Sequence, residues 1–341
     1  MLSTMKFRSR TAWTAAWTAP VLVIGLSLAS CAPGANGPQP QEEAKGEIEF
    51  SAKTSPLTGL DQTSAPANPV YYVKIENTHG GEPQYGENHA DMMIEELVEN
   101  GATRCIGLFY SDLPTKIGHV RSARTTDIAL SQPVNAAIIA SGSAQKTRDD
   151  ILGEPIPFYT WDWQDGAGWS TDPAKQAPYH VLLNLQAMDK AVKRTATPKQ
   201  NYFTFGDGPG DDDVTKKTTS AAVKFSSKTT TRWTYSGGSW HRSPERAAEG
   251  QEFTADTVVV VFARVVEAGY NDKAGHPVPE TVVDGSGRAV ILGDGTATEA
   301  TWNKSKSDGT MTFTSKEGNA VGLKPGHVWL EAVPRGGSVT Y

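Results

Sequence analysis

The sequence has very few cysteines, and this absence limits its chemistry. Only Cys31 and Cys105 occur among 341 residues, which excludes a disulfide framework and a cysteine-based metal cluster. The seven histidines show none of the short spacings typical of zinc ligands. The Gly-x-Ser-x-Gly, His-Glu-x-x-His and P-loop patterns are also missing. We therefore expect neither a metal nor another cofactor, and no motif identifies an enzyme class.

The chain also lacks an excess of positive charge. Its 38 acidic and 32 basic side chains give a formal charge of −6 at pH 7. Because nucleic acids are polyanions that attract basic surfaces, this balance argues against nonspecific nucleic-acid binding. The length of 341 residues exceeds that of one ordinary core and predicts about two domains.

The first thirty residues differ in composition from the rest of the chain. Three basic residues (Lys6, Arg8 and Arg10) and no acidic residue precede an apolar run over residues 12–29. This order is typical of a secretory signal peptide. The segment Leu-Ala-Ser-Cys, which ends at Cys31, resembles a bacterial lipobox, in which the cysteine carries the lipid.

An uncleaved membrane anchor is the alternative interpretation of this segment. It is less favoured, because Pro20 and Gly25 interrupt the apolar run and no basic cluster follows it. We therefore predict a lipoprotein signal peptide over residues 1–30 and a lipid on Cys31. The lipid would anchor the chain to the cell membrane on its extracytoplasmic face, with residues 31–54 as a polar, flexible linker.

Residues 55–209 are expected to form an α/β domain, a mixed sheet with flanking helices. The periodicity predicts strands at residues 70–75, 105–110 and 136–140, and helices at residues 88–100, 121–130 and 144–151. Such alternation places helices on the faces of a sheet. Cys105 has no disulfide partner if Cys31 carries lipid, so it should be a small buried side chain of a strand.

The second half of the sequence changes character. A run rich in glycine and aspartate begins near residue 206, and residues 210–220 are predicted as an interdomain linker. Beyond it, short β-branched and aromatic runs alternate with Asp-Gly turns at residues 284, 294 and 308. This pattern predicts a smaller, mainly antiparallel β domain over residues 221–341.

A basic cluster stands out in the segment KIGHVRSART, residues 116–125. In the predicted helix Arg121 and Arg124 are three positions apart and share a face. Ser122 and the free N–H groups of a helix start add donors, and Arg104 lies on the preceding strand. Guanidinium groups suit carboxylate and phosphate oxygens. We therefore predict an anion-binding site formed by Arg104, Lys116, Arg121, Ser122 and Arg124.

Internal pairing is the alternative for this cluster. The predicted helix 88–100 carries several carboxylates, and these are able to neutralise the arginines. Both interpretations stay open for the cluster, and pairing is favoured for Arg104.

Three residues are candidates for acid–base catalysis: Asp91, Glu95 and His180. Carboxylates on an amphipathic helix usually form its solvated face, and that interpretation is favoured for Asp91 and Glu95. His180 follows an aromatic loop that contains Trp161, Trp163 and Trp169. These rings suit stacking against sugars, whereas the more common arrangement is that they pack the loop onto the sheet.

Several long motifs resemble the YerB family of bacterial lipoproteins, also called DUF3048. They include PQYG, ADMMIEELVENGATR and KIGHVRSAR in the first half, and RWTYSGGSWHR and LKPGHVWLEAVP in the second. The resemblance covers nearly the whole mature chain and implies two domains behind a lipid anchor. It brings no catalytic assignment, although Asp91 and Glu95 match an Asp-x-x-x-Glu pair of the family. The family's Ala-Pro-His-Asn is replaced by Ala-Pro-Tyr-His, which ends at His180.

These observations together predict a membrane-anchored lipoprotein of the cell envelope. We expect its α/β domain to bind an anionic or glycan ligand, or an envelope partner. One alternative is an enzyme that acts on cell-wall glycan or a lipid-linked phosphate. Another is an assembly factor that binds a second envelope protein. The ligand and the oligomeric state are left open.

Overall fold

The computed structural model of the protein describes residues 53–341, apart from residues 163–165, 193–196 and 211–212. The predicted signal peptide, Cys31 and nearly all of the predicted linker lie outside the described residues. Within the described part of the chain, no helix has both the length and the apolar character needed to cross a bilayer.

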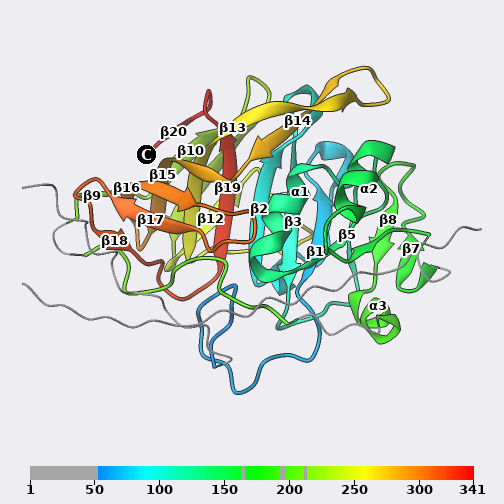
Figure 1. Cartoon of the computed structure of the whole chain (residues 1–341), viewed down its shortest axis with the longest axis horizontal. Helices are drawn as coiled ribbons and strands as arrows, with labels where there is room; N and C mark the ends of the chain where they lie inside the picture. Colours follow the sequence, from blue (N-terminus) through cyan, green and yellow to red (C-terminus); the bar gives the residue numbers. More distant parts are fainter. Residues whose placement is uncertain (1–52, 163–165, 193–196, 211–212) are drawn as a thin grey trace, which may run out of the picture. The chain divides into compact units, whose positions relative to one another are not determined.

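The first half of the described chain contributes strands and a few short helices (Figure 1). Its strands are β1 (Tyr71–Glu76), β2 (Met92–Leu97), β3 (Thr103–Phe109), β4 (Ile117–Gly118), β5 (Ala137–Ile139), β6 (Phe158–Tyr159), β7 (Trp169–Thr171) and β8 (Val181–Leu183). Its helices are α1 (Thr126–Ser131), α2 (Gln145–Leu152) and α3 (Leu185–Ala191), with 3₁₀ turns η1 (His79–Gly81), η2 (Glu87–His89), η3 (Glu99–Gly101) and η4 (Gln132–Val134).

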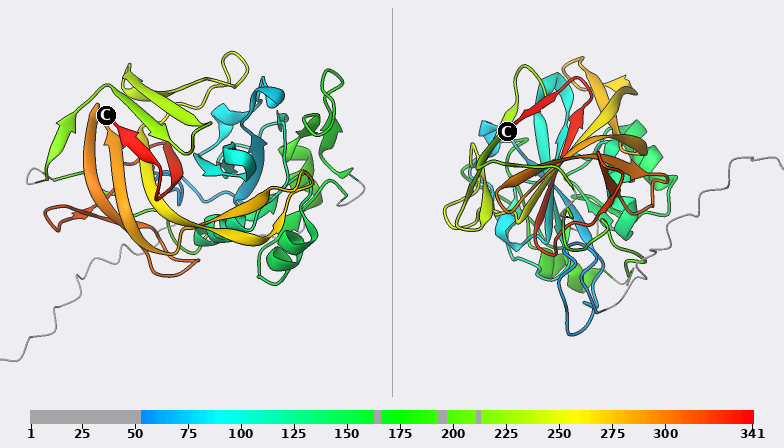
Figure 2. Two further views of the ribbon diagram at one scale, coloured as in Figure 1. Left: turned by 90° about the horizontal axis from the view of Figure 1, so that it is seen from above. Right: turned by 90° about the vertical axis from the view of Figure 1, so that its left-hand side faces the viewer.

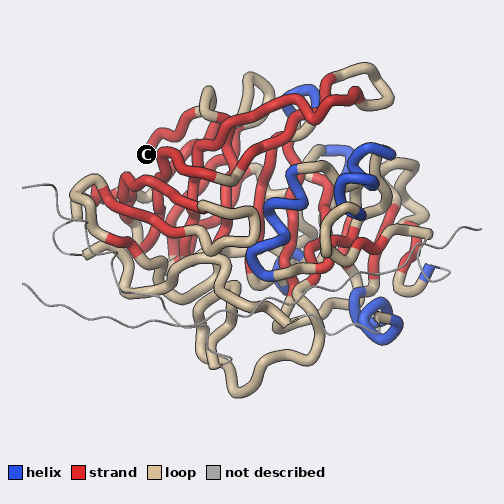
Figure 3. The backbone as a smooth tube through the Cα atoms, viewed as in Figure 1, coloured by secondary structure: helices blue, strands red, loops and turns tan. Residues whose placement is uncertain are grey.

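The described residues of the second half form strands joined by loops and turns, without a helix (Figures 1 and 3). These strands are β9 (Thr215–Lys217), β10 (Ser220–Lys224), β11 (Thr230–Ser236), β12 (Ser239–Ser243), β13 (Thr257–Asn271), β14 (Pro277–Val282), β15 (Gly285–Gly293), β16 (Thr296–Lys304), β17 (Thr312–Ser315), β18 (Ala320–Val321), β19 (Val328–Pro334) and β20 (Ser338–Thr340). The Asp-Gly pair at residues 294 and 295 closes the β15–β16 hairpin as the sequence predicts.

One 13-stranded sheet draws strands from both halves of the chain. Its order is β18-β17-β16-β15-β13-β19-β2-β3-β1-β5-β6, with β14 added to β13 and β9 added to β16. The halves meet where β19 runs parallel to β2 and Glu331 lies opposite Glu95. Strands that precede and follow the predicted linker, residues 210–220, therefore belong to one and the same sheet. The predicted mixed, sheet-rich fold is confirmed at this level.

A second sheet of four strands, in the order β12-β11-β10-β20, covers part of the large sheet (Figure 2). Its inward side chains, among them Val223, Trp233 and Trp240, share a core with Val258 and Trp329 of the large sheet. The opposite face of the large sheet has its own apolar core. Strands in the middle of the large sheet are thus buried on both faces, as β1 shows with six consecutive buried residues.

The helix predicted over residues 88–100 is wrong, because this segment contains strand β2 between two 3₁₀ turns. The carboxylates of Glu95 and Glu96 suggested a solvated helix face, yet both side chains are completely buried. They point to opposite faces of the sheet, and each has polar partners there: Glu96 pairs with Lys74, and Glu95 accepts hydrogen bonds from Asn77 and Thr231.

The predicted helix 121–130 is only partly right. Helix α1 begins at Thr126, so Arg121 and Arg124 precede it in extended chain and share no helix face. The strands and the helix predicted at 70–75, 105–110, 136–140 and 144–151 are present within one or two residues. Cys105 is a completely buried strand residue, as expected.

Candidate functional site

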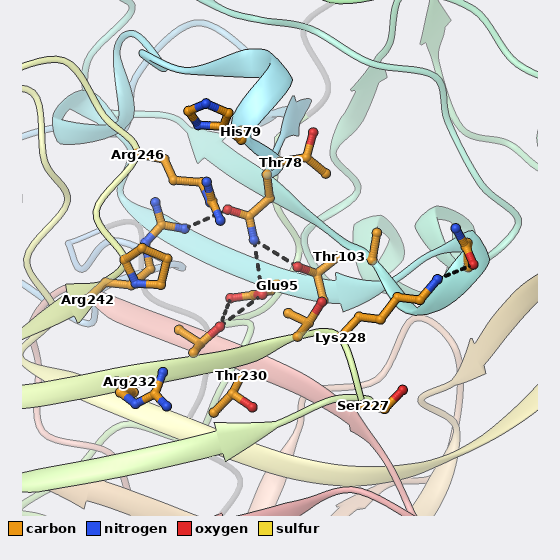
Figure 4. A pocket seen from close by; sticks show the side chains of 16 residues that line it. Thr78, His79, Glu95, Thr103, Ser227, Lys228, Thr230, Arg232, Arg242 and Arg246 are labelled. Atoms are coloured by element: carbon orange, nitrogen blue, oxygen red, sulfur yellow. Dashed lines mark hydrogen bonds between the residues drawn. The ribbon is translucent and has the colours of Figure 1, made fainter.

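A polar cavity of about 570 Å³ opens between the two halves of the described chain (Figure 4). One wall comes from the segments after β1 and around η3, and the other from the chain that enters β11 and leaves β12. The residues that line it are Asn77, Thr78, His79, Glu95, Asn100, Ala102, Thr103, Ser227, Lys228, Thr229, Thr230, Thr231, Arg232, Arg242, Pro244 and Arg246. Hydroxyl and basic side chains make up most of this lining.

The cavity exists because strand β12 is shorter than its neighbour. β12 ends at Ser243, which lies opposite Arg232 of β11. The two preceding residues, Thr230 and Thr231, pair only with β10. After Ser243 the chain turns away through Pro244, so this end of β11 borders the cavity instead of another strand.

Glu95 lies at the floor of the cavity and has no exposed surface. Its carboxylate accepts hydrogen bonds from Asn77 Nδ2 (3.0 Å) and Thr231 Oγ1 (2.9 Å). Burial raises the pKa of Glu95. Burial also raises the pKa of its parallel-strand neighbour Glu331 well above the usual value, and the nearby Glu95 adds to this rise. Two buried carboxyl groups at one place favour the state in which a proton is retained.

Arg242 is the buried cation that faces these carboxylates. Its Nη1 donates to Asn77 Oδ1 (3.2 Å) and its Nη2 to Glu87 Oε2 (3.4 Å). Burial lowers the pKa of Arg242, but the surrounding carboxylates outweigh this effect and raise it overall. Burial likewise raises the pKa of Glu87 to about 7, against the attraction of Arg242. The floor is thus a buried polar network around Arg242, in which Glu87 Oε1, Arg242 Nε and Glu331 Oε2 have no hydrogen-bond partner among the described residues.

The rim of the cavity is different, because its cations are exposed. Lys228 and Arg232 are both exposed, and neither forms an ion pair with any described residue. Lys228 donates to the amide oxygen of Asn100, whereas Arg246 is paired with Glu82. An arginine and a lysine that lack acidic partners, beside several threonine hydroxyls, can donate to the oxygens of an anion or a sugar.

The structure places Arg104 and Arg124 of the predicted anion site inside the protein. Arg124 holds Glu99 with two hydrogen bonds, Nε to Oε1 at 2.5 Å and Nη2 to Oε2 at 2.9 Å. Arg104 Nη1 donates to the backbone oxygen of Ser122 at 2.9 Å. Both arginines are more than nine-tenths buried. The contact of Arg124 is that of the internal-pairing alternative, with the carboxylate supplied by η3 instead of a helix, whereas the hydrogen bond of Arg104 goes to a backbone oxygen.

The two remaining cations of the predicted site also have partners. Arg121 forms an ion pair with Glu76 and stacks on the ring of Tyr179, 4.9 Å from its centroid. Lys116 lies over the ring of Tyr85, 3.2 Å from its centroid. None of the four sequence-predicted cations lines one of the three described cavities.

The three acid–base candidates lie in different places. Asp91 precedes β2, and its Oδ2 accepts hydrogen bonds from the backbone N–H groups of Tyr110 (2.7 Å) and Ser111 (3.0 Å). Since four strand residues span about 13 Å, Asp91 and Glu95 cannot act on one atom. The ring of His180 lies near that of Trp161, with 6.2 Å between the ring centroids and 45° between the ring planes.

Sequence reasoning included Glu95 but missed the basic and threonine residues around it. Asn77 and Thr231 both contact Glu95, although 154 positions separate them in the chain. The available signal was composition: the run Thr-Thr-Thr-Arg that ends at Arg232 contains no acidic residue in an acidic protein. Trp163 of the aromatic loop lies outside the described residues.

Comparison with known proteins places the chain in a family. Residues 57–199 match the N-terminal domain, and residues 221–330 the C-terminal domain, of the family described as "Protein of unknown function (DUF3048)". The chain belongs to the DUF3048 family. The resemblance stated from the sequence motifs is thereby confirmed.

Two matches to YerB of Bacillus subtilis agree with this placement. The chain is 22% identical over 305 residues to the protein named "Putative lipoprotein YerB" of strain 168, covering 86% of this chain and 90% of that protein. It also resembles the crystal structure of YerB from the same species, with a TM-score of 0.69 and 18% identity, over 84% of this chain and 99% of that one. This second likeness shows a shared fold.

Proposed function

We propose that this protein is an envelope lipoprotein that binds an anionic or glycan ligand in the cavity beside β11. The anchor rests on the lipobox-like segment at Cys31 and on the name of the YerB relative. The binding site rests on one observation above all. Lys228 and Arg232 are exposed at the rim of a hydroxyl-rich cavity and have no acidic partner among the described residues.

Charge and hydrogen bonding both favour such a ligand. An exposed guanidinium keeps its donors available, and a ligand oxygen that accepts from it makes a charge-assisted hydrogen bond worth about 1.5–3 kcal/mol. Thr229, Thr230 and Thr231, at the start of β11, add hydroxyl groups to the lining, and a hydroxyl group can donate or accept a hydrogen bond. Below them, the carboxylate of Glu95 already accepts hydrogen bonds from Asn77 and Thr231.

The enzyme alternative uses Glu95 as the acid, since its raised pKa suits proton transfer. Two observations make binding the better proposal. Glu95 has no exposed surface, and both Asn77 and Thr231 occupy its carboxylate. A reacting group would first have to displace these partners.

Calorimetric titration with glycerol 3-phosphate, and with uncharged glycerol as its matched probe, tests the proposal. The wild type should bind the phosphate and not the alcohol. Arg232→Ala should weaken phosphate binding about tenfold or more, given about 1.5–3 kcal/mol for the lost bond. Arg264→Ala removes an exposed arginine from β13, outside the cavity, and should bind as the wild type does. Equal phosphate binding by the two variants would contradict the site.

A further inference from the structure

The outer face of the four-stranded sheet carries positive charge and no negative charge. Strands β10, β11, β12 and β20 contain 20 residues and no aspartate or glutamate, whereas the whole chain has 38 acidic residues in 341. Their side chains alternate strictly between the core and the solvent, so the exposed set is well defined.

Three basic residues form a diagonal row on this face. Lys224 of β10 lies opposite Thr230, Arg232 is two residues further along β11, and His241 of β12 lies opposite Thr234. All three basic side chains are exposed. Diagonal neighbours on adjacent strands are about 7–8 Å apart, so the row crosses three strands in two such steps.

Hydroxyl groups surround this row. The outward positions beside the basic residues are Thr230, Thr234 and Ser243, and the neighbouring strand β20 adds Ser338 and Thr340. Neither Lys224 nor Arg232 forms an ion pair with a described residue. The face is therefore a strip of donors whose charge nothing on the strip neutralises.

The row is continuous with the cavity, because Arg232 belongs to both. Thr230, which lies opposite Lys224, also lines the cavity. A ligand seated at the rim therefore has a path of further donors across the sheet. A small ligand would use the cavity alone, whereas a chain with repeated negative charges would use both.

We propose that the ligand is a linear polyanion, a polymer with repeated phosphate groups, which enters the cavity with one unit and crosses the outer sheet face with the next ones. This inference rests on the proposed binding site and extends it. Charge complementarity carries it: Lys224 and Arg232 meet anionic groups spaced along the polymer, and the hydroxyls and the imidazole of His241 meet its oxygens.

The test compares inorganic phosphate, triphosphate and long-chain polyphosphate as probes, with binding measured at several salt concentrations. Affinity should rise with chain length, and the salt dependence should steepen, because each additional contact releases bound counterions. For polyphosphate, Lys224→Ala should lower by about one the slope of the logarithm of the binding constant against the logarithm of the salt concentration. The same variant should weaken the binding of polyphosphate about fivefold and leave the binding of inorganic phosphate unchanged.

Two variants sharpen the result. Thr234→Glu places a negative charge within the row at an exposed position and should abolish the gain from chain length without changing the melting temperature. Lys273→Ala removes an exposed lysine from the β13–β14 loop and should change nothing. Each variant alters an outward side chain, so circular dichroism should show the wild-type fold.

The outcomes separate the two proposals. If phosphate binds through Arg232 but polyphosphate binds no tighter, the polymer inference is overturned and the cavity site stands. If no phosphate probe depends on Arg232, the proposed function fails as well. If Lys224→Ala weakens binding to phosphatidylglycerol vesicles and not to polyphosphate, the face serves a membrane surface, which also overturns the inference.

Discussion

Two basic regions of this protein differ both in how their cations are spread along the sequence and in how those cations are paired in the structure. The segment 116–125 concentrates its cations within ten residues, whereas the cavity beside β11 collects Lys228, Arg232, Arg242 and Arg246 from separate strands and turns. In the first region each cation meets an internal carboxylate, backbone oxygen or aromatic ring. In the second, Lys228 and Arg232 meet no acidic group among the described residues. A high density of cations in the sequence therefore does not show that these cations are free to bind a ligand.

Burial explains the difference. A buried arginine without a partner costs several kcal/mol, so a chain that places Arg124 between strands must also supply Glu99. An exposed arginine on an outer sheet face carries no such requirement, and Arg232 can keep its donors for a ligand. The following predictions test this contrast from the largest expected effect to the smallest.

Removal of one partner of the buried pair should have the largest effect. Arg124→Ala leaves Glu99 beneath the surface without its two hydrogen bonds, and we expect a loss of about 3–5 kcal/mol in the free energy of unfolding. Urea denaturation measures this loss. The double variant Glu99→Leu/Arg124→Leu should recover part of it, and Arg264→Ala should stay within about 0.5 kcal/mol of the wild type. A stable Arg124→Ala that loses phosphate binding would reverse our assignment of the two regions.

The floor of the cavity should make stability depend on pH. Burial raises the pKa of Glu87 to about 7, compared with about 4.3 in an unfolded chain. The folded state therefore binds this proton more tightly, and the contribution of Glu87 is fully present below pH 4 and is lost as the pH rises through 7. Across that window the wild type should lose about 3 kcal/mol more than Glu87→Gln. Parallel pH dependences would show that the pKa of Glu87 is the same in the folded and unfolded states, which would contradict the prediction.

Thr231→Val should have a moderate effect on the same floor. Valine keeps the shape of threonine but removes the hydroxyl that donates to Glu95, so we expect a loss of about 1–2 kcal/mol in the free energy of unfolding. Thr234→Val, on the exposed face of the same strand, is the matched control and should change stability little. Equal effects of the two substitutions would mean that the hydrogen bond to Glu95 contributes nothing.

The rim should tolerate substitution best. Lys228→Ala should change the free energy of unfolding by less than about 0.5 kcal/mol, because the side chain is exposed and, among the described residues, forms a hydrogen bond only with Asn100. Its binding of glycerol 3-phosphate should nevertheless weaken. A thermal melt and a titration on the same sample compare the two effects. A destabilised Lys228→Ala would place this lysine in the structural network.

The β15–β16 hairpin could be predicted from the sequence, because residue alternation and the Asp-Gly turn at residues 294 and 295 determine it locally. It failed at β2, where Glu95 and Glu96 gave a helix-like polar pattern. Their partners come from distant segments, Lys74 for one and Thr231 for the other. Local periodicity cannot distinguish a solvated carboxylate from a buried one that is paired across the sheet.

The cavity could not be predicted from the sequence either, because its walls come from segments that are far apart in the chain. It depends on β19 lying beside β2 and on β12 ending before β11 does, and both are features of topology. The anion-binding expectation survives as a proposal at a different place. The residues that carry it, Lys228 and Arg232, have no unusual local sequence apart from the lack of nearby acids.

A crystal structure of the protein soaked with glycerol 3-phosphate tests the central claim most directly. Our account predicts the phosphate group in the cavity, within hydrogen-bond distance of the Arg232 guanidinium, with the Arg121–Glu76 and Arg124–Glu99 pairs intact. Phosphate bound beside Arg121 or Arg124, with these ion pairs broken and the cavity empty, would contradict it.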